Sequence, residues 1–338
     1  MKIDRFLVVG ANSFSGSHFV THLLREGIDV IGVSRSKLPS LPFRPFDWYK
    51  GDVEPGGQYT FRQCDLNNFE ETGELVELLR DQQITHVVNF AAQGMVAESW
   101  LYPEDWYQTN VLAQVHFHQL LRSLESLKKY VHVSTPEVYG STDGWISESF
   151  NFYPSTPYAV SRAACDMHLK SFFKAYNFPV VFTRSANVFG PGQQIYRIIP
   201  KTILCARLGE RLKLHGGGGS ERSFIHIDDV CRATLAVTLD QNNIGESYHI
   251  STDKVVSIRS LVELLCAKID VPFDYFVDIE TDRLGKDQGY FLSSQKIRKA
   301  YDWADRIELN DGLDQTIRWV DQNLEGLRIL PREYRHKA

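Results

Sequence analysis

Tyr158 and Arg162 are the pair of side chains in this sequence best suited to chemistry on a hydroxyl group. They are four residues apart at the start of a helical segment, so they share one face of the helix. The pKa of a free phenol, about 10, is too high for a base at neutral pH, and a nearby positive charge lowers it. We predict that Tyr158 accepts a proton from a substrate hydroxyl, with Arg162 as the neighbouring cation.

A hydroxyl and a carboxylate precede this pair, in the sequence Ser134-Thr135-Pro136-Glu137. The residues before them, 130–134, have the pattern of a buried strand. Side chains at the carboxyl end of such a strand lie at the edge of a sheet where ligands bind. We expect Thr135 and Glu137 to face the same cleft as Tyr158. The alternative is that Glu137 is a solvated carboxylate at the strand end.

The chain opens with a turn that suits a pyrophosphate. An apolar run at 6–9 predicts a buried strand, and a helical pattern covers 17–26. Between them lie Gly10, Ser13, Phe14 and Gly16. Glycine permits a tight turn and close approach of the backbone, and the start of a helix offers free N–H groups. The turn predicts a dinucleotide site, although an ordinary strand–helix turn looks the same.

Ser34 and Arg35 follow the second predicted strand, at 30–33. Proteins that bind NAD usually place an acidic residue there to bond the ribose 2′-hydroxyl, whereas an arginine accommodates a 2′-phosphate. These residues favour NADP and leave NAD open.

Apolar runs at 30–33, 87–91, 130–134 and 180–183 alternate with helical patterns. This alternation predicts an α/β fold with a doubly wound parallel sheet of the Rossmann type, covered by helices on both faces. The pattern loosens after residue 190. We expect a dinucleotide-binding domain at 1–188 and a smaller mixed α/β substrate lobe at 189–338, with roughly 225–252 returning to the main domain. The proline-rich segment 39–63 is expected to be a surface excursion, either a lid over the cofactor or decoration.

Composition narrows the possible partners. The chain has 338 residues and a formal net charge of −5 with both signs interspersed, which gives no reason to expect nucleic acid or an anionic membrane. The five cysteines share no metal-ligand spacing, so no metal is expected, and they are typical of buried thiols in a reducing compartment. No signal peptide or membrane-spanning run is evident. A cytoplasmic protein is expected.

Several motifs occur together in one order, and the resemblance they carry covers nearly the whole chain. They are the glycine turn, Asn89-Phe90-Ala91-Ala92, Ser-Thr-x-Glu-Val-Tyr-Gly at 134–140, Tyr-x-x-x-Arg at 158–162, Asn187-Val188-Phe189-Gly190-Pro191 and the stretch 222–229. The chain resembles extended short-chain dehydrogenases/reductases that act on nucleoside-diphosphate sugars. It is most similar to the nucleoside-diphosphate-glucose 4,6-dehydratases, which oxidise C4, lose water across C5 and C6, and return the hydride to C6.

The resemblance implies roles for individual residues. Thr135 would polarise the C4 oxygen, Glu137 would remove the C5 proton, and Tyr158 would take the proton of the 4-hydroxyl. The resemblance implies that the cofactor site comprises Gly10, Ser13, Phe14, Gly16, Ser34, Arg35, Asp65, Leu66, Ala91, Ala92, Tyr158 and Arg162. It implies that the substrate site comprises Asn187, Arg197, Arg222 and Arg283. Arginine suits a diphosphate because its fork pairs two oxygens. Asp65 could instead cap the helix predicted at 66–79.

Three positions depart from the family. Ser13 replaces the middle glycine of the turn. Arg162 replaces a lysine that also holds the nicotinamide ribose, an exchange that is not conservative. Pro136 replaces the aspartate that protonates the departing 6-hydroxyl, so the net reaction stays open. An epimerase or a decarboxylase sharing the C4 oxidation is an alternative, and so is a non-catalytic protein that binds the cofactor or the nucleotide sugar. The stretch 93–97 also lacks the polar residues that dehydratases often carry there.

Two amphipathic helices, predicted at 111–127 and 158–176, resemble the pair that forms a four-helix dimer interface in this family. A homodimer is therefore expected, although the two helices could also only cover the sheet.

Overall fold

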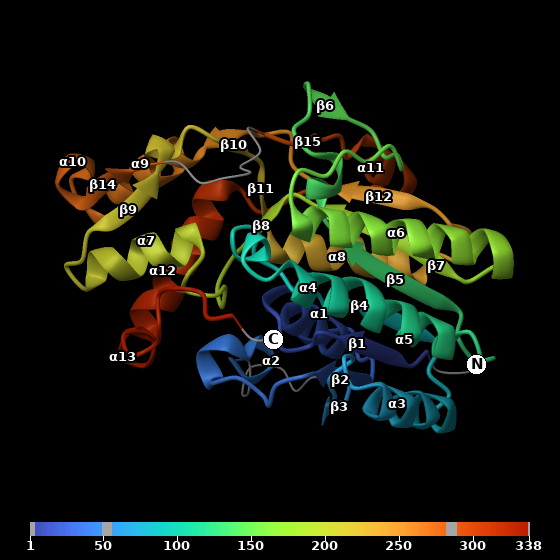
Figure 1. Ribbon diagram of the computed structural model, residues 1–338. Helices are drawn as coiled ribbons and strands as arrows, with labels where there is room; N and C mark the ends of the chain where they lie inside the picture. The colour runs from blue at the N-terminus through green and yellow to red at the C-terminus, as the bar shows by residue number, and fades with distance from the viewer. Residues whose placement is uncertain (1–3, 49–55, 282–288, 337–338) are drawn as a thin grey trace.

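One parallel sheet of seven strands organises the larger part of the chain (Figure 1). The computed structural model describes residues 4–48, 56–281 and 289–336. The strands of the sheet are β1 (Phe6–Val9), β2 (Val30–Ser34), β3 (Tyr59–Gln63), β4 (His86–Asn89), β5 (Lys129–Ser134), β7 (Val180–Ser185) and β12 (Ser247–Ile250). Their spatial order is β12-β7-β5-β4-β1-β2-β3, and every neighbouring pair is parallel. The predicted doubly wound sheet is confirmed.

Helices cover both faces of this sheet because its strands alternate apolar side chains to either side. On β1, Phe6 and Val8 point to one face and Leu7 and Val9 to the other. The helices on the first face are α1 (Phe14–Arg25), α8 (Ile227–Leu239) and α11 (Gln295–Tyr301). Those on the second face are α3 (Phe69–Asp81), α5 (Ala113–Leu121) and α6 (Pro157–Tyr176). Among the described residues no helix combines the length and apolar character needed to span a membrane.

The segment 39–63 is not only a surface excursion. It holds the short turns η1 (Leu41–Phe43) and α2 (Pro45–Trp48), but its last five residues are the edge strand β3, paired with β2. The expectation was wrong there because an edge strand is exposed and lacks the continuous apolar run of a buried one. Residues 49–55 lie outside the described part of the chain.

The predicted helix boundaries hold for α6 and fail for the helix expected at 111–127. That helix ends at Leu121, with a turn following it. At its start it continues back through a π-helical turn, η3 (Gln108–Leu112), into α4 (Pro103–Tyr107). The C-terminal limit was overestimated because Leu124 and Leu127 continue the apolar spacing of the helix while belonging to the loop before β5.

A second lobe gathers around its own apolar core. Its helices are α7 (Ile198–Arg207), α9 (Ile258–Ile269), α10 (Phe273–Phe276), α12 (Leu309–Gln322) and α13 (Leu324–Leu327). Short strand pairs lie in and beside it: β8 (Asn187–Phe189) with β11 (Phe224–His226), β9 (Leu212–His215) with β14 (Val277–Glu280), β10 (Glu221–Arg222) with β13 (Val256–Ser257), and β6 (Trp145–Ile146) with β15 (Phe291–Leu292). Leu204, Leu261 and Trp319 are among the residues of this core.

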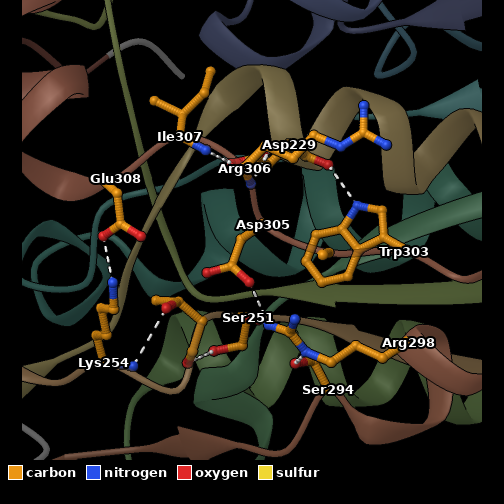
Figure 2. A network of polar contacts seen from close by, with 12 residues as sticks. Asp229, Ser251, Lys254, Ser294, Arg298, Trp303, Asp305, Arg306, Ile307 and Glu308 are labelled. Atoms are coloured by element: carbon orange, nitrogen blue, oxygen red, sulfur yellow. Dashed lines mark hydrogen bonds and ion pairs between the residues drawn. The ribbon is translucent and has the colours of Figure 1, made fainter.

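Asp229, at the start of α8, ties the segment after α11 to the main sheet domain (Figure 2). Its carboxylate is fully buried and accepts hydrogen bonds from the backbone N–H groups of Arg306 (3.0 Å) and Ile307 (3.1 Å). It also pairs with Arg232, and its carbonyl accepts from the indole N–H of Trp303 at 3.2 Å. One buried carboxylate therefore satisfies two backbone N–H groups and a guanidinium.

We predict that Asp229→Ala lowers the free energy of unfolding by about 2–4 kcal/mol, because two backbone N–H groups and a guanidinium lose a fully buried acceptor. Urea denaturation measures the change. The matched control is Asp228→Ala in the same turn, whose side chain is 51% exposed; its effect should stay within about 1 kcal/mol. Equal effects of the two substitutions would contradict the role given to Asp229.

Candidate active site

The turn after β1 is a cradle that only glycine fits. Gly10 has a φ of 78°, and a Cβ there would lie 2.7 Å from the backbone nitrogen of Ala91. A Cβ on Gly16 would lie 2.2 Å from the carbonyl oxygen of Gly10. Ser13 caps α1, its Oγ accepting from the Gly16 N–H at 3.1 Å. Phe14, the first residue of the helix, is buried in the core. The closely packed backbone and the helix start fit the pyrophosphate of a dinucleotide.

The end of β2 is joined to this turn. Ser34 Oγ accepts from the backbone N–H of Asn12 at 2.9 Å. The side-chain amide of Asn12 donates to the carbonyls of Ser36 and Lys37, at 2.8 and 3.0 Å. Asn12 was missed at the sequence level, where it is one polar residue in a turn. Arg35 Nη2 donates to Gln93 Oε1 at 3.1 Å.

The remaining predicted cofactor residues flank the cradle. Ala91 N–H donates to Asn89 Oδ1 at 2.8 Å, and Ala92 follows it at the surface. Asp65 Oδ1 accepts from the backbone of Asn67 at 3.0 Å, and Leu66 is buried in the core. The alternative that Asp65 caps the next helix is wrong. Asn68 caps that helix instead, its side chain accepting from the backbone N–H groups of Glu70 and Glu71.

Thr135, Glu137 and Tyr158 come together beyond the end of β5. Thr135 caps the turn η4 (Pro136–Tyr139), and its hydroxyl donates to Glu137 Oε2 at 3.2 Å. Thr135 also shares a hydrogen bond with Tyr158, in the first turn of α6. Pro136 occupies the first position of η4, where its fixed φ and missing N–H cost nothing. Thr135, Glu137 and Tyr158 therefore lie close together, as the sequence predicts.

The pKa of Tyr158 does not follow the simple expectation. Burial raises the pKa of Tyr158 above its usual value, and the negative charge of Glu137 raises it further. Arg162, the hydrogen bond with Thr135 and Arg197 lower this pKa, but the two raising effects are larger. The sequence shows Arg162 near Tyr158, but it does not show that Tyr158 is buried or that Glu137 faces it.

Arg162 is 2% exposed and lies beneath the catalytic candidates. Its Nη2 donates to the carbonyl oxygen of Val133 and lies 3.3 Å from His132 Nε2. Its Nε and Nη1 are buried without a hydrogen-bond partner among the described residues. Unpartnered donors of this kind fit the hydroxyls of a ribose, so the residues present suit a nicotinamide dinucleotide.

The predicted substrate residues form two groups. Asn187 Oδ1 accepts from the hydroxyl of Tyr290 at 2.9 Å, and the guanidinium carbon of Arg222 lies 4.6 Å from the centre of the same ring. Arg197, at the N-terminus of α7, is exposed and acts on Tyr158 electrostatically. Tyr290 was missed because it lies 103 residues from Asn187 in the chain. Arg283 lies outside the described residues.

Comparisons with known proteins agree with this geometry. The family described as GDP-mannose 4,6 dehydratase matches residues 7–316. A trifunctional UDP-glucose 4,6-dehydratase/UDP-4-keto-6-deoxy-D-glucose 3,5-epimerase/UDP-4-keto-L-rhamnose-reductase of Arabidopsis thaliana is 30% identical over 96% of this chain and 48% of its own length. The chain thus spans about half the length of that relative. A dTDP-D-glucose 4,6-dehydratase of Mus musculus is 31% identical over 94% of this chain and 89% of its own.

Solved structures show the same relationship. DesIV, a dTDP-glucose 4,6-dehydratase from Streptomyces venezuelae with NAD and TYD bound, superposes with a TM-score of 0.85 at 30% identity, covering 95% of this chain and 98% of its own. A dTDP-glucose 4,6-dehydratase from Bacillus anthracis in complex with NAD gives a TM-score of 0.84 at 28% identity, covering 96% and 99%. Sequence and fold agree over almost the whole chain, which belongs to the GDP-mannose 4,6-dehydratase family.

Proposed function

We propose that this protein is a nucleoside-diphosphate-hexose 4,6-dehydratase that works with a bound nicotinamide dinucleotide. The observation that carries the proposal is the contact of Thr135 with both Glu137 and Tyr158 at the end of β5. A hydroxyl donor, a carboxylate and a phenol at one point provide the groups for oxidation at C4 and elimination across C5 and C6.

A nicotinamide dinucleotide supplies the hydride chemistry of such a reaction. We infer that the cradle of Gly10 and Gly16 holds its pyrophosphate and that Arg162 Nε and Nη1 bond its ribose. The similar dehydratase structures carry NAD, which supports NAD here. The preference for NADP predicted from Ser34 and Arg35 has no support in these comparisons, and we propose NAD as the cofactor.

Tyr158 takes the proton of the sugar 4-hydroxyl in the proposed reaction, and Thr135 polarises the same oxygen. The raised pKa of Tyr158 keeps the phenol protonated in the free protein. The positive charge of an oxidised nicotinamide next to Tyr158 would lower this pKa. Removal of the proton would then depend on the presence of the cofactor. The base is thereby active only in a loaded site.

Glu137 removes the proton from C5 and then gives it to the departing 6-hydroxyl, which leaves as water. Pro136 has no proton to give, so the carboxylate that gained the C5 proton is the acid at hand. Its position against Thr135 keeps Glu137 at the end of β5 for both steps.

The substrate diphosphate binds, in this proposal, between two groups of polar residues. Asn187 and Arg222 both contact Tyr290. Arg197 is close enough to Tyr158 to lower its pKa. We propose that 1–188 hold the dinucleotide and that most of 189–338 holds the sugar nucleotide, with 225–252 in the main domain. The pairing of β12 with β7 supports that return.

Two further inferences concern context. All five cysteines are buried free thiols, which supports a reducing compartment such as the cytoplasm.

A homodimer through α5 and α6 is supported by exposed apolar side chains on α6 and on η3, the turn that leads into α5. Leu112 is 55% exposed, Met167 60% and Tyr176 52%. Exposed apolar residues clustered on one face are typical of a protein interface.

The proposal predicts that one of a panel of dTDP-, UDP-, GDP- and CDP-hexoses loses one water, detected by mass spectrometry of the product. Tyr158→Phe should lower turnover at least about 10²-fold because the base for the 4-hydroxyl is removed. Glu137→Gln should stop loss of water while C4 oxidation in a single turnover persists. Near-normal dehydration by both variants would sink the assignment; an unchanged mass with an altered sugar configuration would indicate an epimerase.

The rate of C4 oxidation should rise with pH, because Tyr158 reacts when deprotonated and its pKa is raised. Glu137→Gln removes the charge that helps to raise this pKa, so the rising limb should move to lower pH. Stopped-flow absorbance of the reduced nicotinamide follows the step. Glu104→Gln, an exposed carboxylate on α4, is the control and should leave the limb in place. A rising limb that stays at the same pH, or moves to higher pH, in Glu137→Gln would refute the assignment of Tyr158 as the titrating base.

Analytical ultracentrifugation should find a dimer at micromolar concentration. Met167→Glu should convert it to a monomer, because a charge buried in the interface lacks a partner. Tyr275→Glu, at an 80% exposed position on α10, is the matched control and should remain dimeric. A monomeric wild-type protein, or a dimeric Met167→Glu variant, would argue against this interface.

A further inference from the structure

The last described residues, 331–336, form an extended strap over the two lobes. After α13 the chain turns back toward α4 (Figure 1). Arg332, Tyr334 and His336 are half-buried, while the residues between them are exposed. Arg332 Nε pairs with Glu210 Oε2 at 2.8 Å, and Glu333 pairs with Lys201 Nζ at 2.7 Å. The strap therefore lies along α7 before it leaves the second lobe.

The far end of the strap is anchored on the sheet domain. The ring of His336 stacks between Tyr102 and Trp106, with ring centres 4.9 and 5.0 Å away. His336 Nε2 donates to Asp105 Oδ2 at 2.6 Å. These contacts belong to α4 and the residue before it, so the strap connects α7 to α4.

Gln93 is the point where the strap meets the cofactor site. This side chain is 4% exposed, and its Nε2 donates to the hydroxyl of Tyr334 at 2.8 Å and to His336 Nδ1 at 3.2 Å. Its backbone is fixed by Asn110, which accepts from the N–H at 2.7 Å and donates to the carbonyl at 3.0 Å. Both amide hydrogens face the strap, so the oxygen of the carboxamide is turned toward Arg35.

The bond from Arg35 to Gln93 joins the chain after β2 to the chain after β4. Arg35 follows β2 and Gln93 lies four residues after β4, whereas the glycine turn follows β1. Since β1 lies between β2 and β4 in the sheet, a link between their ends passes over the carboxyl end of β1. That edge is where a dinucleotide lies in folds of this kind.

We propose that the strap determines cofactor choice by fixing Gln93, which holds the guanidinium of Arg35 through one Nη2–H. This bond takes one bidentate edge of the guanidinium away from a ribose 2′-phosphate, whereas a ribose 2′-hydroxyl needs no paired donors. The strap therefore favours NAD over NADP. The inference rests on the dinucleotide site of the proposed function, and it adds residues 331–336 to that site.

The test is the ratio of the dissociation constants of NADP and NAD, measured by tryptophan fluorescence without any sugar. Tyr334→Phe removes the acceptor for Gln93 and keeps the ring against Tyr196. The NADP-to-NAD ratio should fall about fivefold, or ~1 kcal/mol, as expected for one hydrogen bond. Arg335→Ala, at an exposed position of the strap, is the matched control and should leave the ratio unchanged.

Two further variants separate the strap from general damage to the fold. A chain that ends at residue 330 should lower the ratio at least as far as Tyr334→Phe. In an Arg35→Ala background, Tyr334→Phe should leave the ratio unchanged, because the residue through which the strap acts is gone. An unchanged ratio in the shortened chain, or an effect that persists without Arg35, would overturn the inference. Failure of the wild-type protein to bind either dinucleotide would overturn the proposed function itself.

Discussion

The site depends on one buried carboxylate, Asp166 on α6. Its oxygens pair with Arg184 of β7 at 2.8 Å and lie 3.2 Å from His132 of β5, and the hydroxyl of Ser134 donates to it at 2.8 Å. Burial alone would raise the pKa of Asp166, but Arg184 and His132 lower it to about 2. A charge buried this deeply is costly unless it is paired, so α6 is held in one position against both strands. Arg162 lies one turn before Asp166 and Tyr158 one turn before that.

Two of the three departures from the family, Arg162 and Pro136, lie at the end of β5. Arg162 is longer than lysine and reaches under β5 to the carbonyl of Val133, with His132 beside it. Two of its nitrogens are buried without a hydrogen-bond partner among the described residues, so the fork contacts β5 and keeps donors to spare. Pro136 begins the turn that places Glu137 against Thr135. Arg162 thus contacts β5, and Pro136 lies in the turn that carries Glu137.

The sequence predicts the parts of this protein that local patterns encode. Strand periodicity gives the parallel sheet, and the spacing of Tyr158 and Arg162 gives a shared helix face. Long-range pairing is not encoded locally. The sequence gives no sign of a role for Gln93, in the stretch 93–97. Its partner Tyr334 lies 241 residues away in the chain, so their contact cannot be read from local patterns. The rise in the pKa of Tyr158 was missed for a similar reason, since burial is a property of the packed structure.

The most direct test of the account is the fate of a deuterium atom placed on C4 of the accepted nucleotide hexose. Oxidation at C4 by a retained cofactor, followed by elimination through Glu137, predicts that the label reappears on C6 of the dehydrated product, as seen by mass spectrometry and NMR. Return of the label to C4 of an unchanged or epimerised sugar would show that elimination does not occur. Loss of the label to solvent would contradict a hydride that leaves and returns within one closed site.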